Sequence, residues 1–183
     1  MLRAWLAGDA GLPVPDSLVQ RLLAELPRAA AGSAWPGPGG LLRLHAGALH
    51  TLPPETPAPV PPERLAIDLR RPGRHPVPPW GGHFVVTSVA QGGLAPELLR
   101  QAELRPRRGG ERFQAAPGSL PRSLKLQFQA AGVPAWQRGG PLLFAGERLL
   151  FVPGLGLDAR CLAPAGSPMR GLRWQAGAAD PAG

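Results

Sequence analysis

The 183-residue sequence has one cysteine, one lysine among its 20 basic residues, and no tyrosine. A lone cysteine, Cys161, cannot form an internal disulfide, which is typical of a reducing compartment. Arg3 and Asp9 interrupt the N-terminal residues before an apolar core of the signal-peptide type could form. These absences predict a cytoplasmic location.

Long uncharged apolar runs are also missing. A membrane span needs roughly 18 to 20 such residues, and the best candidate, residues 141–157, contains Glu147 and Arg148. Gly and Pro supply 25 residues each, a proportion at which disorder must be considered, yet 44% of the residues are hydrophobic. We therefore expect a soluble protein with no membrane partner, made of one or two small folded pieces joined by Pro-rich connectors.

The net charge of +8 is distributed unevenly. Residues 1–99 hold eight basic and seven acidic residues, whereas residues 100–183 hold 12 basic and five acidic residues. Within residues 105–125, six basic residues accompany a single acid, Glu111. Clustered cations favour a polyanionic partner, because each phosphate that they neutralise releases condensed counterions. The alternative is a solvated basic face with no partner.

The N-terminal segment, residues 1–52, is predicted to form two helices and a hairpin. Apolar residues recur with helical spacing over residues 18–26, where Asp16 or Ser17 could cap the helix, and a short helix at residues 2–6 precedes it. Residues 41–45 and 48–52 then flank a turn at Ala46-Gly47. So few apolar residues suggest part of a larger unit. Residues 53–62, with six prolines in ten, are expected to be an extended linker and the main domain boundary.

The C-terminal segment, residues 63–176, is predicted to be α+β, with short mixed or antiparallel strands and one amphipathic helix. Strand candidates cover residues 65–69, 83–90, 104–108, 142–144, 149–152 and 171–174, and a second Pro-rich stretch, residues 72–79, separates the first two. We expect residues 177–183 to be a disordered tail.

The predicted helix spans residues 122–131. Its apolar side carries Leu124, Phe128 and Ala131, and its polar side carries Arg122, Lys125 and Gln129. Gly132 suits a C-terminal cap and Pro134 a stop. One face is thus expected to pack on the core while the other presents positive charge, although an ordinary surface helix has the same pattern.

Catalytic motifs are not found. The only lysine lies in the predicted helix rather than after a Gly-rich phosphate loop, and no serine sits in a Gly-x-Ser-x-Gly elbow. The run Gly154 to Ala159 matches a dinucleotide fingerprint by letter, but no helix is predicted after it, which favours a turn. The four histidines have no metal-ligand spacing, and Cys161 has no neighbouring base. We expect no catalytic residue, no metal site and no cofactor bound by this chain.

Several short motifs occur in one order over residues 100–160: Leu104-Arg-Pro-Arg-Arg-Gly-Gly-Glu-Arg-Phe113, Arg122-Ser-Leu-Lys125, Phe128-Gln-Ala-Ala-Gly-Val-Pro-Ala-Trp136-Gln-Arg138, Pro141-Leu-Leu-Phe144 and Val152-Pro-Gly-Leu-Gly156. This order resembles the C-terminal domain of bacterial tRNA(Ile)-lysidine synthetases. Residues 2–6, 11–13 and the Leu-rich helix are similar to the end of that family's middle, substrate-recognition domain.

The resemblance implies a tRNA-binding role. Members use ATP, with Mg, and lysine to convert the wobble cytidine of an isoleucine tRNA to lysidine, through an N-terminal domain with a Ser-Gly-Gly-x-Asp-Ser loop that this sequence does not contain. Residues 1–52 would be the remainder of the middle domain, and residues 63–176 the domain that grips the acceptor-stem side of the tRNA. The ATP-binding domain would be encoded upstream or supplied by another chain.

Seven cations stand where the sequence matches the family motifs, and we expect them to contact phosphates: Arg105, Arg107, Arg108, Arg112, Arg122, Lys125 and Arg138. Gly109 and Gly110 are expected to shape the turn before Arg112, while Phe113 and Trp136 are expected to pack. The sequence departs from the family by having Leu126 beside the matched lysine and alanines in the hairpin, which would weaken the grip on RNA. Two alternatives stay open: a module that binds RNA or an acidic protein by itself, and a non-functional gene fragment.

Overall fold

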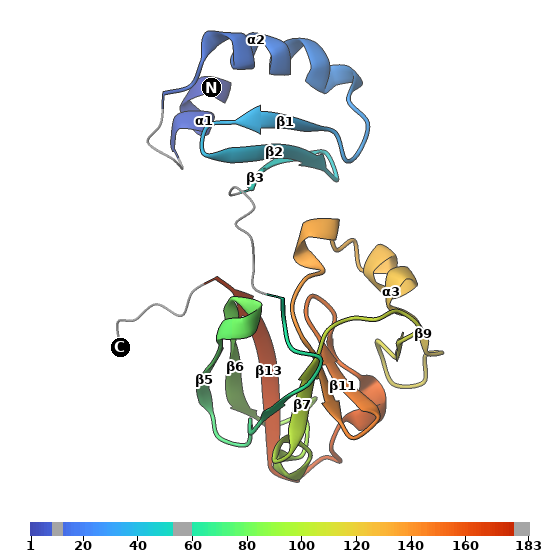
Figure 1. The fold of residues 1–183 in the computed structure, drawn as a ribbon. Coiled ribbons are helices and arrows are strands. Elements are labelled where there is room, and N and C mark those ends of the chain that lie inside the picture. The colour runs from blue at the N-terminus through green and yellow to red at the C-terminus, as the bar shows by residue number, and fades with distance from the viewer. Residues whose placement is uncertain (9–12, 53–59, 178–183) are drawn as a thin grey trace. The chain divides into compact units, whose positions relative to one another are not determined.

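The computed structural model describes residues 1–8, 13–52 and 60–177 (Figure 1). The chain divides into two compact units, Met1–Pro57 and Ala58–Gly183. Most of the predicted linker, residues 53–59, and almost all of the predicted tail, residues 178–183, lie outside the described residues.

Among its described residues, 1–8 and 13–52, unit 1 contains two α-helices and a three-stranded antiparallel sheet in the order β1-β2-β3. Its elements are α1 (Leu2–Gly8), α2 (Asp16–Glu25), a 3-10 turn (Leu26–Arg28), β1 (Ala34–Gly37), β2 (Gly40–His45) and β3 (Ala48–Leu52). Both helices and the β2–β3 hairpin confirm the sequence prediction. The predicted side-chain cap is wrong, because Pro15 occupies the N-cap and Asp16 already lies in the first turn.

Strand β1 was not predicted, because its sequence, Ala34-Trp35-Pro36-Gly37, is typical of a turn. The strand forms at the edge of the sheet, where Pro36 need not donate to a partner. Trp35 is buried with Leu6, Leu22 and Leu42 in the core of unit 1. The indole N–H of Trp35 also donates to the Glu25 carboxylate at 2.6 Å, which joins β1 to the end of α2.

Over residues 60–177, unit 2 is built from antiparallel strands, one α-helix and several 3-10 turns. Its α-helix and strands are β4 (Leu65–Ile67), β5 (Gly73–Val77), β6 (Gly82–Val89), β7 (Ala102–Arg105), β8 (Arg112–Phe113), β9 (Arg122–Ser123), α3 (Leu124–Ala130), β10 (Leu142–Ala145), β11 (Arg148–Val152), β12 (Gly156–Leu157) and β13 (Met169–Ala176). The strands pair in the orders β12-β11-β10-β7-β4, β13-β6-β5 and β8-β9. Together with its helix, this arrangement confirms the α+β class.

The predicted strands of unit 2 are present, with small shifts at their ends; residues 104–108, for example, become β7 at residues 102–105. The prediction that residues 72–79 form only a Pro-rich separator is wrong, since β5 pairs with β6 over residues 73–77. Pro76 is tolerated there because β5 is an edge strand. Strand β6 pairs on its other side with β13 over eight positions, from Gly82 with Ala176 to Val89 with Met169.

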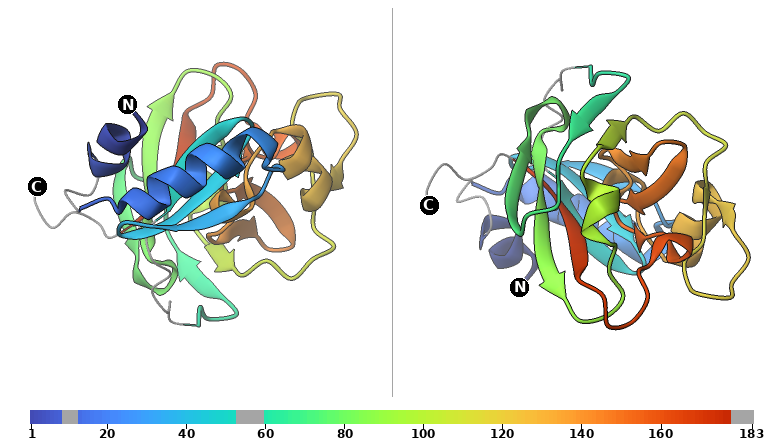
Figure 2. Two further views of the ribbon diagram at one scale, coloured as in Figure 1. Left: turned by 90° about the horizontal axis from the view of Figure 1, so that it is seen from above. Right: turned by 90° about the horizontal axis from the view of Figure 1, so that it is seen from below.

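The β10–β11 hairpin separates two hydrophobic clusters. Leu143 and Leu150 belong to the larger cluster, which also contains Phe84 and Val86 of β6. Leu142, Leu149 and Val152 belong to the smaller one, which contains Phe113, Leu124 and Phe128. Burial on both faces explains the unbroken apolar runs of these strands. The smaller cluster fixes α3 and the β8–β9 pair at one side of unit 2, which can be followed in both views of Figure 2.

Helix α3 is shorter than expected, because Arg122 and Ser123 pair with β8 instead of starting the helix. Leu124 and Phe128 are buried as predicted, whereas Ala131 is exposed and Gln127 takes its place on the buried side. Gly132 ends the helix with a φ of +64°. The Val133 N–H donates to the Phe128 carbonyl at 3.0 Å, the Gly132 N–H donates to the Gln129 carbonyl at 3.1 Å, and these bonds form a Schellman motif.

Candidate nucleic-acid interface

The cations selected from the sequence are concentrated around α3, β8 and β9. Arg107, Arg108, Arg112, Arg122 and Lys125 are exposed, and Arg138 is half-buried. The elements that carry them pack on the β10–β11 hairpin through the buried side chains of Phe113, Leu124 and Phe128. We call these six residues, 107, 108, 112, 122, 125 and 138, the basic face.

Arg105 has a different environment from the basic face, because its side chain is only 13% exposed. Its guanidinium donates to Glu103 at 2.9 Å, to the Gly146 carbonyl at 2.7 Å and to Glu147 at 3.2 Å. It also lies 4.6 Å from the centre of the Phe144 ring. These contacts hold β7 against the β10–β11 turn, so the geometry favours a structural role for Arg105.

Phe128 positions two cations at the C-terminal end of α3. The guanidinium carbons of Arg107 and Arg138 lie 5.4 and 5.5 Å from the centre of its ring, within the range of a cation–π contact. Arg138 is further held by donation from its Nε to the Val133 carbonyl at 2.8 Å. Both arginines are therefore oriented by the core while Arg107 keeps an exposed guanidinium.

A glycine turn leads into β8. Gly109 and Gly110 have φ values of +92° and +84°, in the left-handed region that side chains disfavour. The Glu111 carboxylate accepts hydrogen bonds from the backbone N–H groups of Arg108, at 2.7 Å, and Gly109, at 3.0 Å. The single acid of residues 105–125 thus has its charge directed toward the backbone. Among the neighbouring guanidiniums, that of Arg108 forms an ion pair with Glu63, at 2.8 Å, from outside this run.

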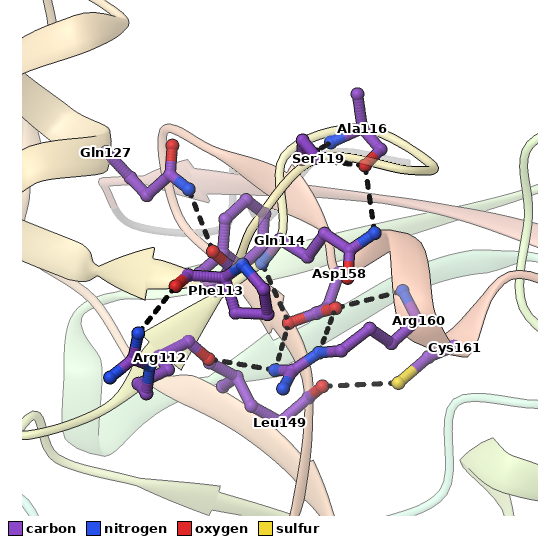
Figure 3. Close-up of polar contacts among 11 residues, drawn as sticks. Arg112, Phe113, Gln114, Ala116, Ser119, Gln127, Leu149, Asp158, Arg160 and Cys161 are labelled. Atoms are coloured by element: carbon purple, nitrogen blue, oxygen red, sulfur yellow. Dashed lines mark hydrogen bonds and ion pairs between the residues drawn. The ribbon is translucent and has the colours of Figure 1, made fainter.

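The carboxylate of Asp158 supports β8 through hydrogen bonds with Arg160 and Gln114, as Figure 3 shows. Asp158 is fully buried, and its carboxylate accepts hydrogen bonds from Arg160 Nη2 at 2.7 Å, Arg160 Nε at 2.9 Å and the Gln114 N–H at 3.3 Å. Arg160 Nη2 also donates to the Arg112 carbonyl at 2.9 Å. The pair therefore connects the end of β12 to the strand that carries Arg112.

Two further contacts complete the support of β8. The buried Gln127 side chain donates to the Phe113 carbonyl at 2.8 Å. Arg112 Nη2 donates to the Pro121 carbonyl at 2.8 Å, which closes the loop between β8 and β9. The sequence prediction missed Asp158 and Arg160 because Asp158 lies in the fingerprint-like run, which was interpreted as a turn, and Arg160 follows directly after it. In the structure, residues 153–155 form the turn between β11 and β12, and a 3-10 turn covers Ala159–Cys161. An available signal was the Asp-x-Arg spacing, which also occurs at residues 68–70.

Phe113 and Cys161 both lie in the interior of unit 2. Phe113 is fully buried, as expected. Cys161 is 4% exposed, and its thiol donates to the Leu149 carbonyl at 3.3 Å. Burial raises the pKa of the Cys161 thiol, and the negative charge of Asp158 acts in the same direction. A raised pKa is the opposite of what an activated nucleophile requires.

No three His, Cys, Asp or Glu side chains among residues 1–8, 13–52 and 60–177 are grouped so that they could hold a metal ion. In the same residues, no helix combines the length and the apolar character needed to cross a membrane.

Comparisons with known proteins agree with the sequence resemblance. Residues 102–174 match the family model of the TilS substrate C-terminal domain. The tRNA(Ile)-lysidine synthase of Ralstonia nicotianae is 37% identical over 176 residues, which cover 88% of this chain and 37% of that protein. The enzyme of the same name from Alkalilimnicola ehrlichii is 35% identical over 174 residues, which cover 91% of this chain and 38% of that protein.

A crystal structure of a TilS C-terminal domain is 25% identical, with a TM-score of 0.45, and the match covers 62% of this chain and 97% of that one. The chain spans less than two fifths of the length of the two named relatives. The matched residues 102–174 contain all six residues of the basic face as well as Asp158 and Arg160. The chain therefore belongs to the tRNA(Ile)-lysidine synthase family, and residues 102–174 are its TilS substrate C-terminal domain.

Proposed function

We propose that this chain is the tRNA-recognising portion of a tRNA(Ile)-lysidine synthase and that its basic face grips the acceptor-stem side of an isoleucine tRNA. The single observation that carries the proposal is the set of five exposed cations and one half-buried cation that a buried scaffold presents on one side of unit 2. The names of its relatives add the identity of the RNA.

The residues of the basic face suit the surface of an RNA stem. An A-form helix offers phosphates and 2′-hydroxyls, whereas its major groove is too narrow for side chains to read. Guanidinium groups donate two parallel hydrogen bonds to one phosphate, and five of the six residues are arginines. Because Phe128 orients Arg107 and Arg138 and the Asp158 pair orients the strand of Arg112, less conformational entropy is lost on binding.

Catalysis in this proposal belongs to the family's ATP-binding domain, in cis or from another chain. ATP with Mg, and lysine, would bind there, and we assign no step of the chemistry to any residue of this sequence, which lacks the Ser-Gly-Gly-x-Asp-Ser loop. The chain would supply RNA recognition in the cytoplasm, where its single buried thiol stays reduced.

A salt titration of tRNA binding tests the proposal. Binding of the full chain to an isoleucine tRNA transcript is measured by fluorescence anisotropy between 50 and 200 mM salt; about five phosphate contacts predict a slope near −4.5 in log K against log salt. Lys125→Ala and Arg122→Ala should each reduce the slope by about one. Arg74→Ala is the matched control, because it makes the same change of charge. Arg74 is exposed and lies on β5, in the β13-β6-β5 sheet rather than the β8-β9 sheet.

A slope near zero for the unaltered chain would refute the proposal. Capture of an acidic protein that persists after RNase treatment, with no binding to the transcript, would favour the interaction module instead. Equal effects of Arg74→Ala and Lys125→Ala would show that net charge, rather than the basic face, determines binding.

A further inference from the structure

Beside the basic face, a pocket of about 320 Å³ opens between β8 and the β10–β11 hairpin. It is lined by Glu111, Arg112, Phe144, Glu147, Arg148, Leu149 and Arg160. Two of its three arginines, Arg148 and Arg160, were not selected from the sequence, because they follow β10 and β12 rather than the Arg-rich run. The fold brings them to Arg112 from 36 and 48 residues away in the sequence.

The acidic groups of this pocket already have hydrogen-bond donors. Glu111 accepts from backbone N–H groups at 2.7 to 3.1 Å, and Glu147 accepts from Arg105 at 3.2 Å. Asp158, which is fully buried and does not line the pocket, accepts hydrogen bonds from Arg160 and from the Gln114 N–H. None of these carboxylates depends on the pocket for its partner.

The arginines of the pocket retain donors. Within the described part of the chain, the Arg148 side chain forms no hydrogen bond or ion pair, and Arg160 uses its backbone N–H, Nε and Nη2 but not Nη1. Arg112 uses only Nη2, on the Pro121 carbonyl. The pocket therefore holds more N–H donors than acceptors, which is the composition that an anion with several oxygens would balance.

The remaining wall is apolar and rigid. Phe144 is half-buried and Leu149 is 5% exposed, and both belong to the hairpin that lies between the two hydrophobic clusters. Arg160 is fixed by the fully buried Asp158. Sites for small ligands have volumes of roughly 300 to 1,000 Å³, so this pocket is large enough for more than a bare phosphate. A ribose or base against Phe144 would use the apolar wall.

We infer that this pocket, which we name the three-arginine pocket, binds one nucleotide of the RNA, with its phosphate between Arg112, Arg148 and Arg160 and its nucleoside against Phe144. The inference rests on the proposed function and makes it more specific, because it adds one phosphate contact and one stacked or packed nucleoside to the contacts of the basic face.

The first test uses tRNA. Arg148→Ala should weaken binding of the full chain to the transcript about tenfold, as expected for the loss of a hydrogen bond to a charged group. It should also reduce the slope against log salt by about 0.9, the contribution of one phosphate. Arg148→Lys should restore most of the slope, and Arg74→Ala should change neither quantity. The melting temperature of each variant confirms that it is folded.

The second test uses a mononucleotide and reads the pocket directly. In ¹H–¹⁵N spectra that record arginine Nε–H groups, cytidine 5′-monophosphate should shift the signals of Arg112 and Arg148, inorganic phosphate should shift them less, and cytidine should not. Shifts of equal size from phosphate and from the nucleotide would refute the nucleoside contact. Unshifted signals at millimolar nucleotide would refute the pocket as a phosphate site.

The two proposals fail in different ways. If the unaltered chain has a steep salt dependence that Arg148→Ala leaves intact, the three-arginine pocket is refuted and the basic face stands. If the unaltered chain has no salt dependence while the mononucleotide shifts the arginine signals, recognition of tRNA is refuted and the pocket binds free nucleotides instead.

Discussion

Replacement of Asp158 by asparagine should destabilise unit 2 strongly, because the side chain is fully buried and accepts four hydrogen bonds. Asparagine keeps the size and one acceptor oxygen. On its other branch, an NH₂ group would face two donors, Arg160 Nη2 and the Gln114 N–H, in place of the oxygen that now accepts from both at 2.7 and 3.3 Å.

The magnitude follows from these contacts. Removing one partner of a buried ion pair costs about 3 to 5 kcal/mol, and a buried N–H left without an acceptor costs about 1 to 3 kcal/mol. Arg160 is 42% exposed, so water can solvate part of its charge, which places the expected loss near the lower end, at about 3 kcal/mol. For a unit of this size, that loss lowers the melting temperature by about 10 °C.

Asp68 provides a matched control for this substitution. Asp68 and Arg70 repeat the geometry of Asp158 and Arg160: the backbone N–H of the arginine donates at 3.0 Å, and Nη2 donates at 2.6 Å where the buried pair has 2.7 Å. The Asp68 pair is exposed, at 45% and 41%. Asp68→Asn should therefore change the melting temperature little, because solvent screens such a pair.

Differential scanning calorimetry of the full chain measures both variants. The transition of unit 2 should shift for Asp158→Asn and stay in place for Asp68→Asn. Equal shifts would refute the reasoning, because they would mean that the local Asp-x-Arg geometry, and not burial, determines the contribution to stability.

Three further predictions concern other sites. Ala46 has a φ of +48° in the two-residue turn before Gly47, so Ala46→Asn should stabilise unit 1 by about 0.5 to 1 kcal/mol in thermal unfolding, and a loss of stability would contradict this account of the turn. The hydrogen bonds from Arg70 lower the pKa of Asp68 to about 2, so its carboxyl should titrate near that value by NMR and at a higher pH in Arg70→Gln, which removes the guanidinium but keeps the backbone N–H that donates to Asp68; an unchanged pKa would contradict this cause. The stabilising contribution of the Asp68 carboxylate is complete above about pH 3.9 and disappears as the pH falls toward about 2. Cys161 should react slowly with a thiol reagent at neutral pH and quickly in denaturant, because burial raises its pKa, and rapid labelling of the folded chain would show that the thiol is accessible.

Elements whose signals are local could be predicted from the sequence. Helix α3 follows from the spacing of Leu124 and Phe128 and from the cap at Gly132, all of which lie within nine residues. The β10–β11 hairpin follows from two apolar runs around a short turn. The concentration of cations over residues 105–138 also needed no structure, because charge is counted directly from the sequence.

Other features depended on tertiary context that a local pattern does not contain. Strands β1 and β5 contain Pro36 and Pro76, and they form only because each lies at the edge of a sheet, where a missing N–H costs little. Arg105 had the same sequence signal as its neighbours, yet the distant Gly146 and Glu147 meet its guanidinium.

The sequence by itself determined the family, the class of fold and the positive charge of the C-terminal half, because motif order, periodicity and composition are written in consecutive residues. Tertiary structure alone decided which cations are exposed to solvent and which, like Arg105, are held in hydrogen bonds within the fold. It brought Arg112, Arg148 and Arg160 around one pocket and placed the buried Asp158 behind them, since contacts across 36 to 48 residues form only when the two hydrophobic clusters fix β8 and the β10–β12 strands in register.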